Sequence, residues 1–222
     1  MIVQNKPIVG GEEAQPFEFP HAVHIDAYVT NNKGRRVCGG VLISPQHILT
    51  AAHCLNGAKP GDKIRIGYGG SSVDLFSYVY SDSHAVHPEY NSKTLDNDIA
   101  VVHLPKPLRT TKAVYPIPIY TGPVTTDTEL ITLGWGTTNN DPNARTSSLL
   151  HKAQVRVGRQ KYCQGLRHSY VSSNGPVVCA GPSLAGRDAC YGDSGGPLVM
   201  TGENAHMPHQ KFALVGLTSY GE

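Results

Sequence analysis

The chain has 222 residues, of which 39% are hydrophobic and 16% are charged, and its formal net charge is +2. This composition excludes a disordered chain, and so weak a positive charge does not support binding to nucleic acid. No apolar run approaches the roughly 18 residues of a membrane-spanning helix, so we expect no membrane partner. The length fits one large all-β domain or two small lobes that share an interface.

The 24 glycines and 16 prolines indicate many turns, and therefore many short strands rather than a helical bundle. Segments rich in Val, Ile, Leu and Tyr and bounded by turn residues predict strands. In chain order these are His21–Val29, Val37–Ile43, Lys63–Tyr68, Ile99–Leu104, Glu129–Trp135, Pro197–Met200 and Lys211–Ser219. Turns or loops are predicted at Gly69–Ser72 and Asn139–Asn143, and a short helix at Arg159–Leu166.

Five prolines lie between Pro105 and Pro123. Proline has no N–H to donate, so this stretch resists strand pairing and is interpreted as a connector between two β halves. We expect a single domain over residues 1–222, with an N-terminal half at 1–112 and a second half at 113–222. The Lys and Arg residues are scattered apart from Arg35-Arg36, and we interpret them as a solvated surface.

The segment Gly192-Asp193-Ser194-Gly195-Gly196-Pro197 combines a hydroxyl with glycines. A serine needs a base to remove its proton before it can act as a nucleophile. Glycines allow a tight turn in which the N–H groups of Gly192 and Ser194 face a developing oxyanion. The alternative is a glycine-rich turn that only leads into the next strand.

A candidate base lies in Thr50-Ala51-Ala52-His53-Cys54. Histidine accepts a proton near neutral pH, and the small residues before it leave room around the ring. The chain has eleven histidines. The others have no comparable setting, show no zinc-ligand spacing and are interpreted as surface or packed side chains.

A candidate orienting carboxylate lies in Asp96-Asn97-Asp98, directly before an apolar strand. There it can accept a hydrogen bond from an imidazole N–H and so fix the tautomer of the ring. In isolation, an ordinary turn aspartate is the alternative. The three signals together, in the order His, Asp, Ser, are much more specific than any one of them.

From Ile8 to Gly221 the chain resembles the trypsin/chymotrypsin family of serine endopeptidases. The matching segments are Ile8-Val9-Gly10-Gly11, Cys38-Gly39-Gly40, Thr50–Cys54, Asp98-Ile99-Ala100, Gly134-Trp135-Gly136, Gly192–Pro197 and Ser219-Tyr220-Gly221. The resemblance implies an all-β fold of two packed antiparallel β-barrels with a catalytic triad of His53, Asp98 and Ser194 between them. It also implies that Ser219 hydrogen-bonds the buried aspartate.

The resemblance also implies a specificity for the bond that is cut. Asp188 lies six residues before Ser194, where the family has the floor of its primary specificity pocket. A carboxylate there favours Lys or Arg in the substrate, because a partly buried charge is stabilised by an opposite charge. Ser219 and Gly221 are expected to contact substrate at the edge of this pocket.

Activation in this family depends on a new N-terminus. The resemblance implies that Asp193 pairs with the α-amino group of Ile8 after cleavage before Ile8. Here Pro7 precedes Ile8, and the nearest basic residue, Lys6, is followed by that proline. We therefore expect a precursor form with weak activity until Ile8 is released.

The five cysteines leave one without a partner. The resemblance implies two disulfides, Cys38 with Cys54 and Cys163 with Cys179. It implies that Cys190 pairs with a cysteine beyond Glu222, so the second barrel is expected to be truncated at the C-terminus. Disulfides favour a secreted, extracellular protein.

We expect no cofactor and no metal, because no acidic loop resembles the calcium site of some trypsins. The chain has no Asn-x-Ser/Thr sequon, so N-glycosylation is not expected. The expected partners are protein or peptide substrates and protein protease inhibitors, and the expected state is a monomer. The competing function is a catalytically silent binding protein on a protease fold, although such proteins usually lose a triad residue.

Overall fold

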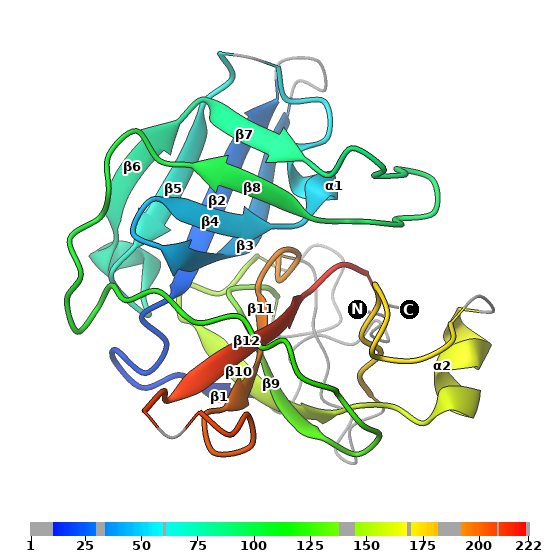
Figure 1. Ribbon diagram of the computed structural model, residues 1–222. Helices are drawn as coiled ribbons and strands as arrows, with labels where there is room; N and C mark the ends of the chain where they lie inside the picture. Colours follow the sequence, from blue (N-terminus) through cyan, green and yellow to red (C-terminus); the bar gives the residue numbers. More distant parts are fainter. Residues whose placement is uncertain are drawn as a thin grey trace.

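The computed structural model describes residues 11–29, 34–59, 61–137, 145–167, 170–181, 192–207 and 209–220. Over these ranges the protein consists of two antiparallel sheets packed against each other, with little helix (Figure 1). The prediction of an all-β fold is confirmed. We call the seven-stranded sheet the first lobe and the five-stranded sheet the second lobe.

The first lobe has the strand order β6-β5-β2-β3-β4-β8-β7. In chain order its strands are β2 (Ala22–Val29), β3 (Gly34–Ser44), β4 (His47–Thr50), β5 (Ile64–Tyr68), β6 (Ser77–Ser81), β7 (Ser83–Val86) and β8 (Ala100–His103). The alternation typical of a strand is clear in β2, where Val23, Ile25 and Ala27 are buried in the lobe core. The pairing of β4 with β8 matters most for the site described below, because Thr50 lies opposite Ala100.

The second lobe has the strand order β1-β10-β9-β11-β12. Its strands are β1 (Glu12–Glu13), β9 (Glu129–Gly134), β10 (His151–Arg156), β11 (Pro197–Thr201) and β12 (Phe212–Leu217). Glu12 pairs with Lys152, so β1 belongs to the second lobe although it precedes every strand of the first lobe in the chain.

Helical segments are short throughout the described ranges. They are α1 (Ala52–Leu55), the 3-10 turn η2 (Val73–Leu75) and α2 (Gln160–Leu166). None of them is long and apolar enough to cross a membrane. The predicted helix at 159–166 is present, with Arg159 at its N-cap position.

A shared hydrophobic core joins the two lobes. It is formed by buried residues from strands of both sheets and from segments that flank or connect them, namely Ala14, Phe19, Ala22, Val41, Leu49, Ile117, Leu133, Trp135, Leu150, Val199, Phe212 and Leu214. Trp135 is 2% exposed, and its ring N–H donates a hydrogen bond to the carbonyl oxygen of Ser71, 3.0 Å away, in the first half of the chain. The proline-rich connector contributes Ile117 to this core and forms no strand.

The predicted strands all correspond to observed strands, with ends that differ by up to three residues. Several strands were not predicted: β1, β4, β6, β7 and β10. The clearest case is β10, whose sequence His-Lys-Ala-Gln-Val-Arg places the exposed polar residues Gln154 and Arg156 on the face away from the buried Ala153 and Val155. Its apolar positions are too few to predict a strand from composition.

Candidate active site

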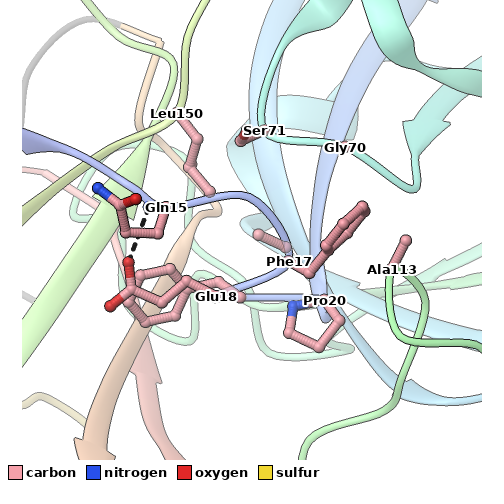
Figure 2. Close-up of a pocket in the computed structure, with 10 residues that line it drawn as sticks. Gln15, Phe17, Glu18, Pro20, Gly70, Ser71, Ala113 and Leu150 are labelled. Carbon is pink, nitrogen blue, oxygen red and sulfur yellow. Dashed lines mark hydrogen bonds between the residues drawn. The ribbon is translucent and has the colours of Figure 1, made fainter.

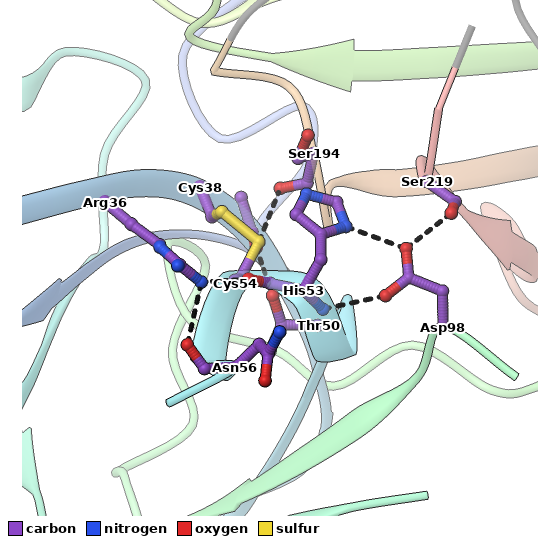
Figure 3. The surroundings of a disulfide bond; sticks show 10 residues. Arg36, Cys38, Thr50, His53, Cys54, Asn56, Asp98, Ser194 and Ser219 are labelled. Carbon is purple, nitrogen blue, oxygen red and sulfur yellow. Dashed lines mark hydrogen bonds and ion pairs between the residues drawn. A yellow bond between two sulfur atoms is a disulfide. The ribbon is translucent and has the colours of Figure 1, made fainter. Parts of the chain in front are cut away.

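Asp98 is held at the junction of the two lobes. Its side chain is 3% exposed, so it is not an ordinary turn aspartate at the surface. Oδ1 accepts a hydrogen bond from the backbone N–H of His53 at 2.8 Å, and Oδ2 accepts one from the hydroxyl of Ser219 (Figure 3). Ser219 follows β12 of the second lobe, so one carboxylate connects both lobes.

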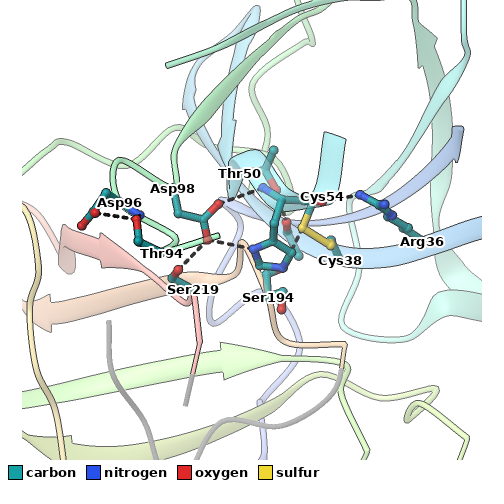
Figure 4. A network of polar contacts seen from close by, with 11 residues as sticks. Arg36, Cys38, Thr50, Cys54, Thr94, Asp96, Asp98, Ser194 and Ser219 are labelled. Atoms are coloured by element: carbon teal, nitrogen blue, oxygen red, sulfur yellow. Dashed lines mark hydrogen bonds and ion pairs between the residues drawn. A yellow bond between two sulfur atoms is a disulfide. The ribbon is translucent and has the colours of Figure 1, made fainter. Parts of the chain in front are cut away.

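Asp96, two residues earlier, faces different partners (Figure 4). Its Oδ2 accepts a hydrogen bond from the hydroxyl of Thr94 at 2.5 Å, and its Oδ1 pairs with the guanidinium of Arg167. Between the two aspartates, Asn97 adopts a left-handed conformation with φ +55°, which asparagine tolerates better than most residues. Only Asp98 contacts the histidine.

The carboxyl group of Asp98 stays ionised at neutral pH. Burial alone raises its pKa, but hydrogen bonds and charge from His53 and the hydroxyl of Ser219 outweigh burial and hold the pKa below its ordinary value. An ionised carboxylate only accepts hydrogen bonds. The ring nitrogen that faces it must therefore carry the proton.

That ring nitrogen is Nδ1 of His53, which lies 2.8 Å from Oδ2 of Asp98. With the proton on Nδ1, the other ring nitrogen, Nε2, keeps a lone pair and is able to accept a proton. Figure 3 shows Ser194 next to the His53 ring. The structure therefore brings together Asp98, His53 and Ser194, contributed by three separate parts of the chain.

Ser194 is half-buried and is held by its backbone. Its carbonyl oxygen accepts a hydrogen bond from the N–H of Gly39 at 2.8 Å, and the N–H of Gly195 donates to the carbonyl of Thr218 at 2.7 Å. Gly195 has φ +77°, and a Cβ there would lie 2.2 Å from Oγ1 of Thr50. No residue other than glycine fits this position without moving its neighbours.

The N–H groups of Gly192 and Ser194 are available to a ligand. Among the residues that the structure describes, neither N–H is bonded to a carbonyl or side-chain oxygen. Gly192 adopts φ +97°, a conformation that favours glycine. Two free donors beside a serine hydroxyl suit stabilisation of negative charge on a substrate oxygen.

Asp193 is fully buried directly below this turn. Its Oδ1 accepts a hydrogen bond from the N–H of Gly136 at 2.8 Å. A Cβ on Gly136 would lie 2.6 Å from the carboxyl carbon, so glycine at this position makes room for the buried carboxylate. Asp193 therefore couples the serine turn to the Gly134-Trp135-Gly136 segment that the sequence analysis identified.

Two hollows differ greatly in what they can hold. The first, lined by Gln15, Phe17 and Leu150 among others, has about 10 Å³ of space, which is at most one water molecule (Figure 2). The second has about 370 Å³ and is lined by Asp98 and Ser219 together with apolar side chains such as Ile99, Ile119 and Leu217. Only the second, which adjoins the candidate active site, is large enough for part of a substrate.

Four predicted functional positions lie outside the described residues: Ile8, Asp188, Cys190 and Gly221. The structure therefore does not test the specificity pocket, the activation pair or the fifth cysteine.

Two disulfides are present, Cys38–Cys54 and Cys163–Cys179, as the family resemblance implied. Each joins residues 16 positions apart and stabilises the fold by about 3 kcal/mol. The sulfur of Cys54 lies 3.8 Å from the carbonyl oxygen of Ser194. It has no hydrogen to donate because it is in a disulfide, so this contact is packing between the lobes.

The ring of His53 and the sulfurs of Cys38 and Cys54 lie within 4.8 Å of one another. Zinc is bound by cysteine thiolates, and a disulfide offers none. This group is therefore the packing of a disulfide beneath the histidine and does not resemble a metal centre.

The sequence analysis missed the role of Arg36, which it assigned to a solvated surface. The guanidinium of Arg36 donates hydrogen bonds to the carbonyl oxygens of His53 at 2.5 Å and Asn56 at 3.0 Å. Its neighbour Arg35 pairs with the buried carboxylate of Asp26 at 2.5 Å. Arg35 is exposed, as expected, but its ion pair was not predicted; Arg36 is half-buried, so the solvated interpretation is wrong for it. The only signal in the sequence was that the two arginines are adjacent.

Arg167 was also missed, although it connects the lobes at the edge of the site. It lies at the end of α2, pairs with Asp96 of the first lobe, donates to the hydroxyl of Tyr220 and lies over its ring at 5.8 Å. Tyr220 follows Ser219, so this contact supports the segment that reaches Asp98. Nothing in the sequence around Arg167 indicates a partner 71 residues away.

Comparison with known proteins agrees with this arrangement. Residues 8–222 match a family model described as Trypsin. A trypsin of Simulium vittatum is 31% identical over 223 residues, which cover 98% of this chain and 83% of that protein. The vitellin-degrading protease of Bombyx mori is 33% identical over 221 residues, covering 96% and 75%. Kallikrein-14 of Homo sapiens is 32% identical over 222 residues, covering 98% and 75%.

Proposed function

The chain belongs to the trypsin family, and from this premise we propose that it is a serine endopeptidase in which Ser194, His53 and Asp98 carry out the chemistry. The observation that carries the proposal is the 2.8 Å contact between Nδ1 of His53 and Oδ2 of Asp98, with Ser194 next to the same ring. A silent protein that kept only the fold has no need to keep this contact.

Proton transfer opens the reaction. Oγ of Ser194 attacks the carbonyl carbon of the scissile peptide bond, and Nε2 of His53 takes the hydroxyl proton. The carbonyl oxygen gains negative charge and is stabilised by the N–H groups of Gly192 and Ser194. When the C–N bond breaks, His53 returns its proton to the leaving amine and an acyl-enzyme remains.

Water completes the cycle by the same steps. His53 removes a proton from the water molecule, whose oxygen attacks the acyl carbon, and then returns the proton to Oγ of Ser194 as the carboxylic acid leaves. Throughout, Asp98 stabilises the protonated ring of His53 and does not itself take the proton. The hydroxyl of Ser219 supports this role because it helps to keep the pKa of Asp98 low.

Cleavage after Lys or Arg is the specificity that we propose. It rests on Asp188, six residues before Ser194, where the family has its pocket floor. A carboxylate at the bottom of a pocket pairs with the long cationic side chains of lysine and arginine. The substrates would be proteins or peptides, and the same pocket would receive a basic side chain of a protein inhibitor.

Activation by a free Ile8 is part of the proposal. The fully buried carboxylate of Asp193 is a suitable partner for a new α-amino group, since a buried charge is stabilised by an opposite one. The pair would order the Gly192–Ser194 turn. An extracellular setting is supported by the two disulfides, which persist in oxidising compartments.

The test is cleavage of a Lys or Arg chromogenic peptide and a matched aromatic peptide by two forms, one with residues 1–7 and one that begins at Ile8. We expect cleavage of the basic peptide, faster in the Ile8 form, and labelling of Ser194 by a fluorophosphonate. Ser194→Ala should lower kcat roughly 10⁶-fold, whereas the exposed control Ser148→Ala should leave it unchanged.

Each part of the proposal would be contradicted by a different result. Cleavage after aromatic residues, or no effect of Asp188→Ser, would remove the Lys/Arg assignment and keep the triad. Full turnover with residues 1–7 attached would remove the activation step. Neither labelling nor cleavage by the Ile8 form would leave the catalytically silent binding protein as the better interpretation.

A further inference from the structure

The strand that leads to His53 and the strand that follows Asp98 carry a pair of histidines at their far ends. β4 begins at His47 and runs toward His53, and β8 runs from the Asp98 side and ends at His103. The two strands are adjacent (Figure 1), and their register places His47 directly opposite His103. Nε2 of His47 lies 3.1 Å from Nδ1 of His103.

The pair lies on the outer face of the sheet. The next residues along the strands, Ile48 and Val102, are also opposite each other and are fully buried in the core. Because side chains alternate along a strand, His47 and His103 project to the other side. His103 is exposed, so an ion in solvent has access to the pair and the ring of His103 has room to rotate.

A hydrogen bond orients His47 as a metal ligand requires. Its Nδ1 lies 2.7 Å from Oγ of Ser44 on the neighbouring strand β3. With Nδ1–H as the donor, Nε2 keeps its lone pair and faces His103. Metal-bound histidines almost always donate their second ring N–H to a protein or water oxygen in this way.

We propose that His47 and His103 form a binding site for a divalent transition-metal cation, Zn²⁺ or Cu²⁺. Two metal–nitrogen bonds of about 2.05 Å across the observed 3.1 Å make an angle of about 98°, which lies between square-planar and tetrahedral values. Imidazole is a ligand that both metals accept readily, whereas Mg²⁺ and Ca²⁺ prefer oxygen.

Water completes the coordination of the ion. In the part of the chain that the structure describes, no third His, Cys, Asp or Glu joins the pair within ligand distance. The site is therefore weaker than a structural zinc site with four protein ligands. Binding is nevertheless favoured by the two strands, because their ladder already holds both rings at the required separation.

The protons balance without another reactant. In the metal-free pair, one N–H lies between the two rings. For both facing nitrogens to bind the ion, the proton on Nδ1 of His103 moves to Nε2 of the same ring. In the metal-free pair Nε2 faces the amide N–H₂ group of Gln46 at 3.4 Å, so the shift gives up that contact and the new N–H donates to solvent at the exposed edge. When both rings are neutral beforehand, binding of the ion releases no proton. When one ring is protonated beforehand, binding releases one proton.

The bound ion would link β4 to β8 and stabilise the lobe that supplies His53 and Asp98. The expectation that no metal binds rested on the lack of an acidic calcium-type loop and on the spacing of the histidines along the sequence. His47 and His103 are 56 residues apart, and only the strand register brings them together. Local spacing therefore has no means of showing this site.

The test is thermal unfolding of the Ser194→Ala protein, which avoids self-digestion, after treatment with EDTA. Added Zn²⁺ or Cu²⁺ should raise Tm by roughly 5–10 °C at about 100 times Kd, and Mg²⁺ should not. The rise should be lost in His103→Gln and in His47→Gln. It should be kept in His209→Gln, which removes an exposed histidine of the second lobe.

The proposal would be overturned by no rise in the parent protein, or by the same rise in His103→Gln. His53 is a competing ligand, so a His53→Ala version is measured as well, and loss of the rise there would also refute the site. Cu²⁺ electron paramagnetic resonance provides a second readout, with hyperfine splitting from two nitrogens expected. Because an inactive variant is used, the result is independent of whether the protein is a protease.

Discussion

The two halves of the candidate active site are held by different kinds of contact. On the first lobe, His53 and Asp98 are fixed by side chains: they bond to each other, and the guanidinium of Arg36 bonds to the backbone of the helix that carries His53. On the second lobe, Ser194 is fixed by backbone hydrogen bonds and by a left-handed glycine, Gly195. The first half therefore depends on charge and donors, and the second on the path of the main chain.

In the half of the site that is fixed by side chains, the largest effect on activity is expected from Asp98→Asn. An amide presents an N–H₂ group to Nδ1 of His53, so the ring proton moves to Nε2 and the base is lost. We expect kcat to fall about 10⁴-fold, with the fold kept. Steady-state kinetics with the basic peptide measure this, and the exposed Asp74→Asn is the control. A loss of less than tenfold would contradict the role of Asp98.

In the half of the site that is fixed by the backbone, the largest effect on stability is expected from Gly195→Ala. The new methyl group meets Oγ1 of Thr50 and is placed on a residue with φ +77°, so we expect a loss of roughly 2–5 kcal/mol in the free energy of unfolding. This corresponds to a fall in Tm of roughly 5–15 °C by calorimetry.

The matched control is Gly165→Ala. Gly165 lies in α2, has an ordinary φ, and a Cβ there meets nothing within 4 Å. We expect this change to stabilise the protein by about 0.5–1 kcal/mol. Equal effects of the two substitutions would show that the backbone at Ser194 is less constrained than the structure indicates.

A smaller effect is expected from Arg36→Met, which keeps most of the side-chain volume but removes both donors to the α1 turn. Hydrogen bonds from a charged group contribute about 1.5–3 kcal/mol, so we expect a destabilisation of about 2 kcal/mol. The ring of His53 would also be less well placed, with kcat lowered several-fold. Urea unfolding checks the first expectation, with the exposed Arg109→Met as control; an unchanged midpoint would contradict it.

The smallest effect is expected from Ser219→Ala, and it should depend on pH. The folded pKa of Asp98 lies below its ordinary value, so this group adds stability that is present above about pH 4 and is lost as pH falls through the folded pKa. Without the hydroxyl, the folded pKa moves up toward the unfolded one. We expect a deficit of about 1–2 kcal/mol at pH 7 that shrinks below pH 4, measured by urea unfolding; a deficit constant down to pH 2 would exclude this cause.

The same contrast explains what the sequence predicts well. Apolar runs such as those in β2 and β3 predict strands because the apolar pattern that leads to their burial lies within a few consecutive residues. The strand β10 escapes prediction because it alternates polar with apolar positions and has few apolar residues, and β4 because only two of its four residues, Ile48 and Leu49, are apolar. Their pairing is decided by neighbours far along the chain.

For the candidate active site, the residues proposed to carry the chemistry could be predicted from the sequence. The residues that hold them in place could not. His53, Asp98 and Ser194 stand in short segments whose residue types fit a definite chemistry. Arg36 and Arg167 act through carbonyl and carboxylate partners that only the folded chain brings near them. Long-range contacts of this kind carry no local pattern, which is also why the histidine pair was not predicted.

The pairing of β1 with β10 affects the order in which the protein is completed during synthesis. The seven strands of the first lobe have all been synthesised once His103 is made, and domains generally fold as units, N-terminal first, during synthesis. β1, although it is made first, has no partner until residues 151 and 152 exist. Thus β1, the first strand in the described part of the chain, is among the last to be built into a sheet. Neither lobe is a separable piece of the gene product, because cutting the chain between the halves removes an edge strand from the second lobe.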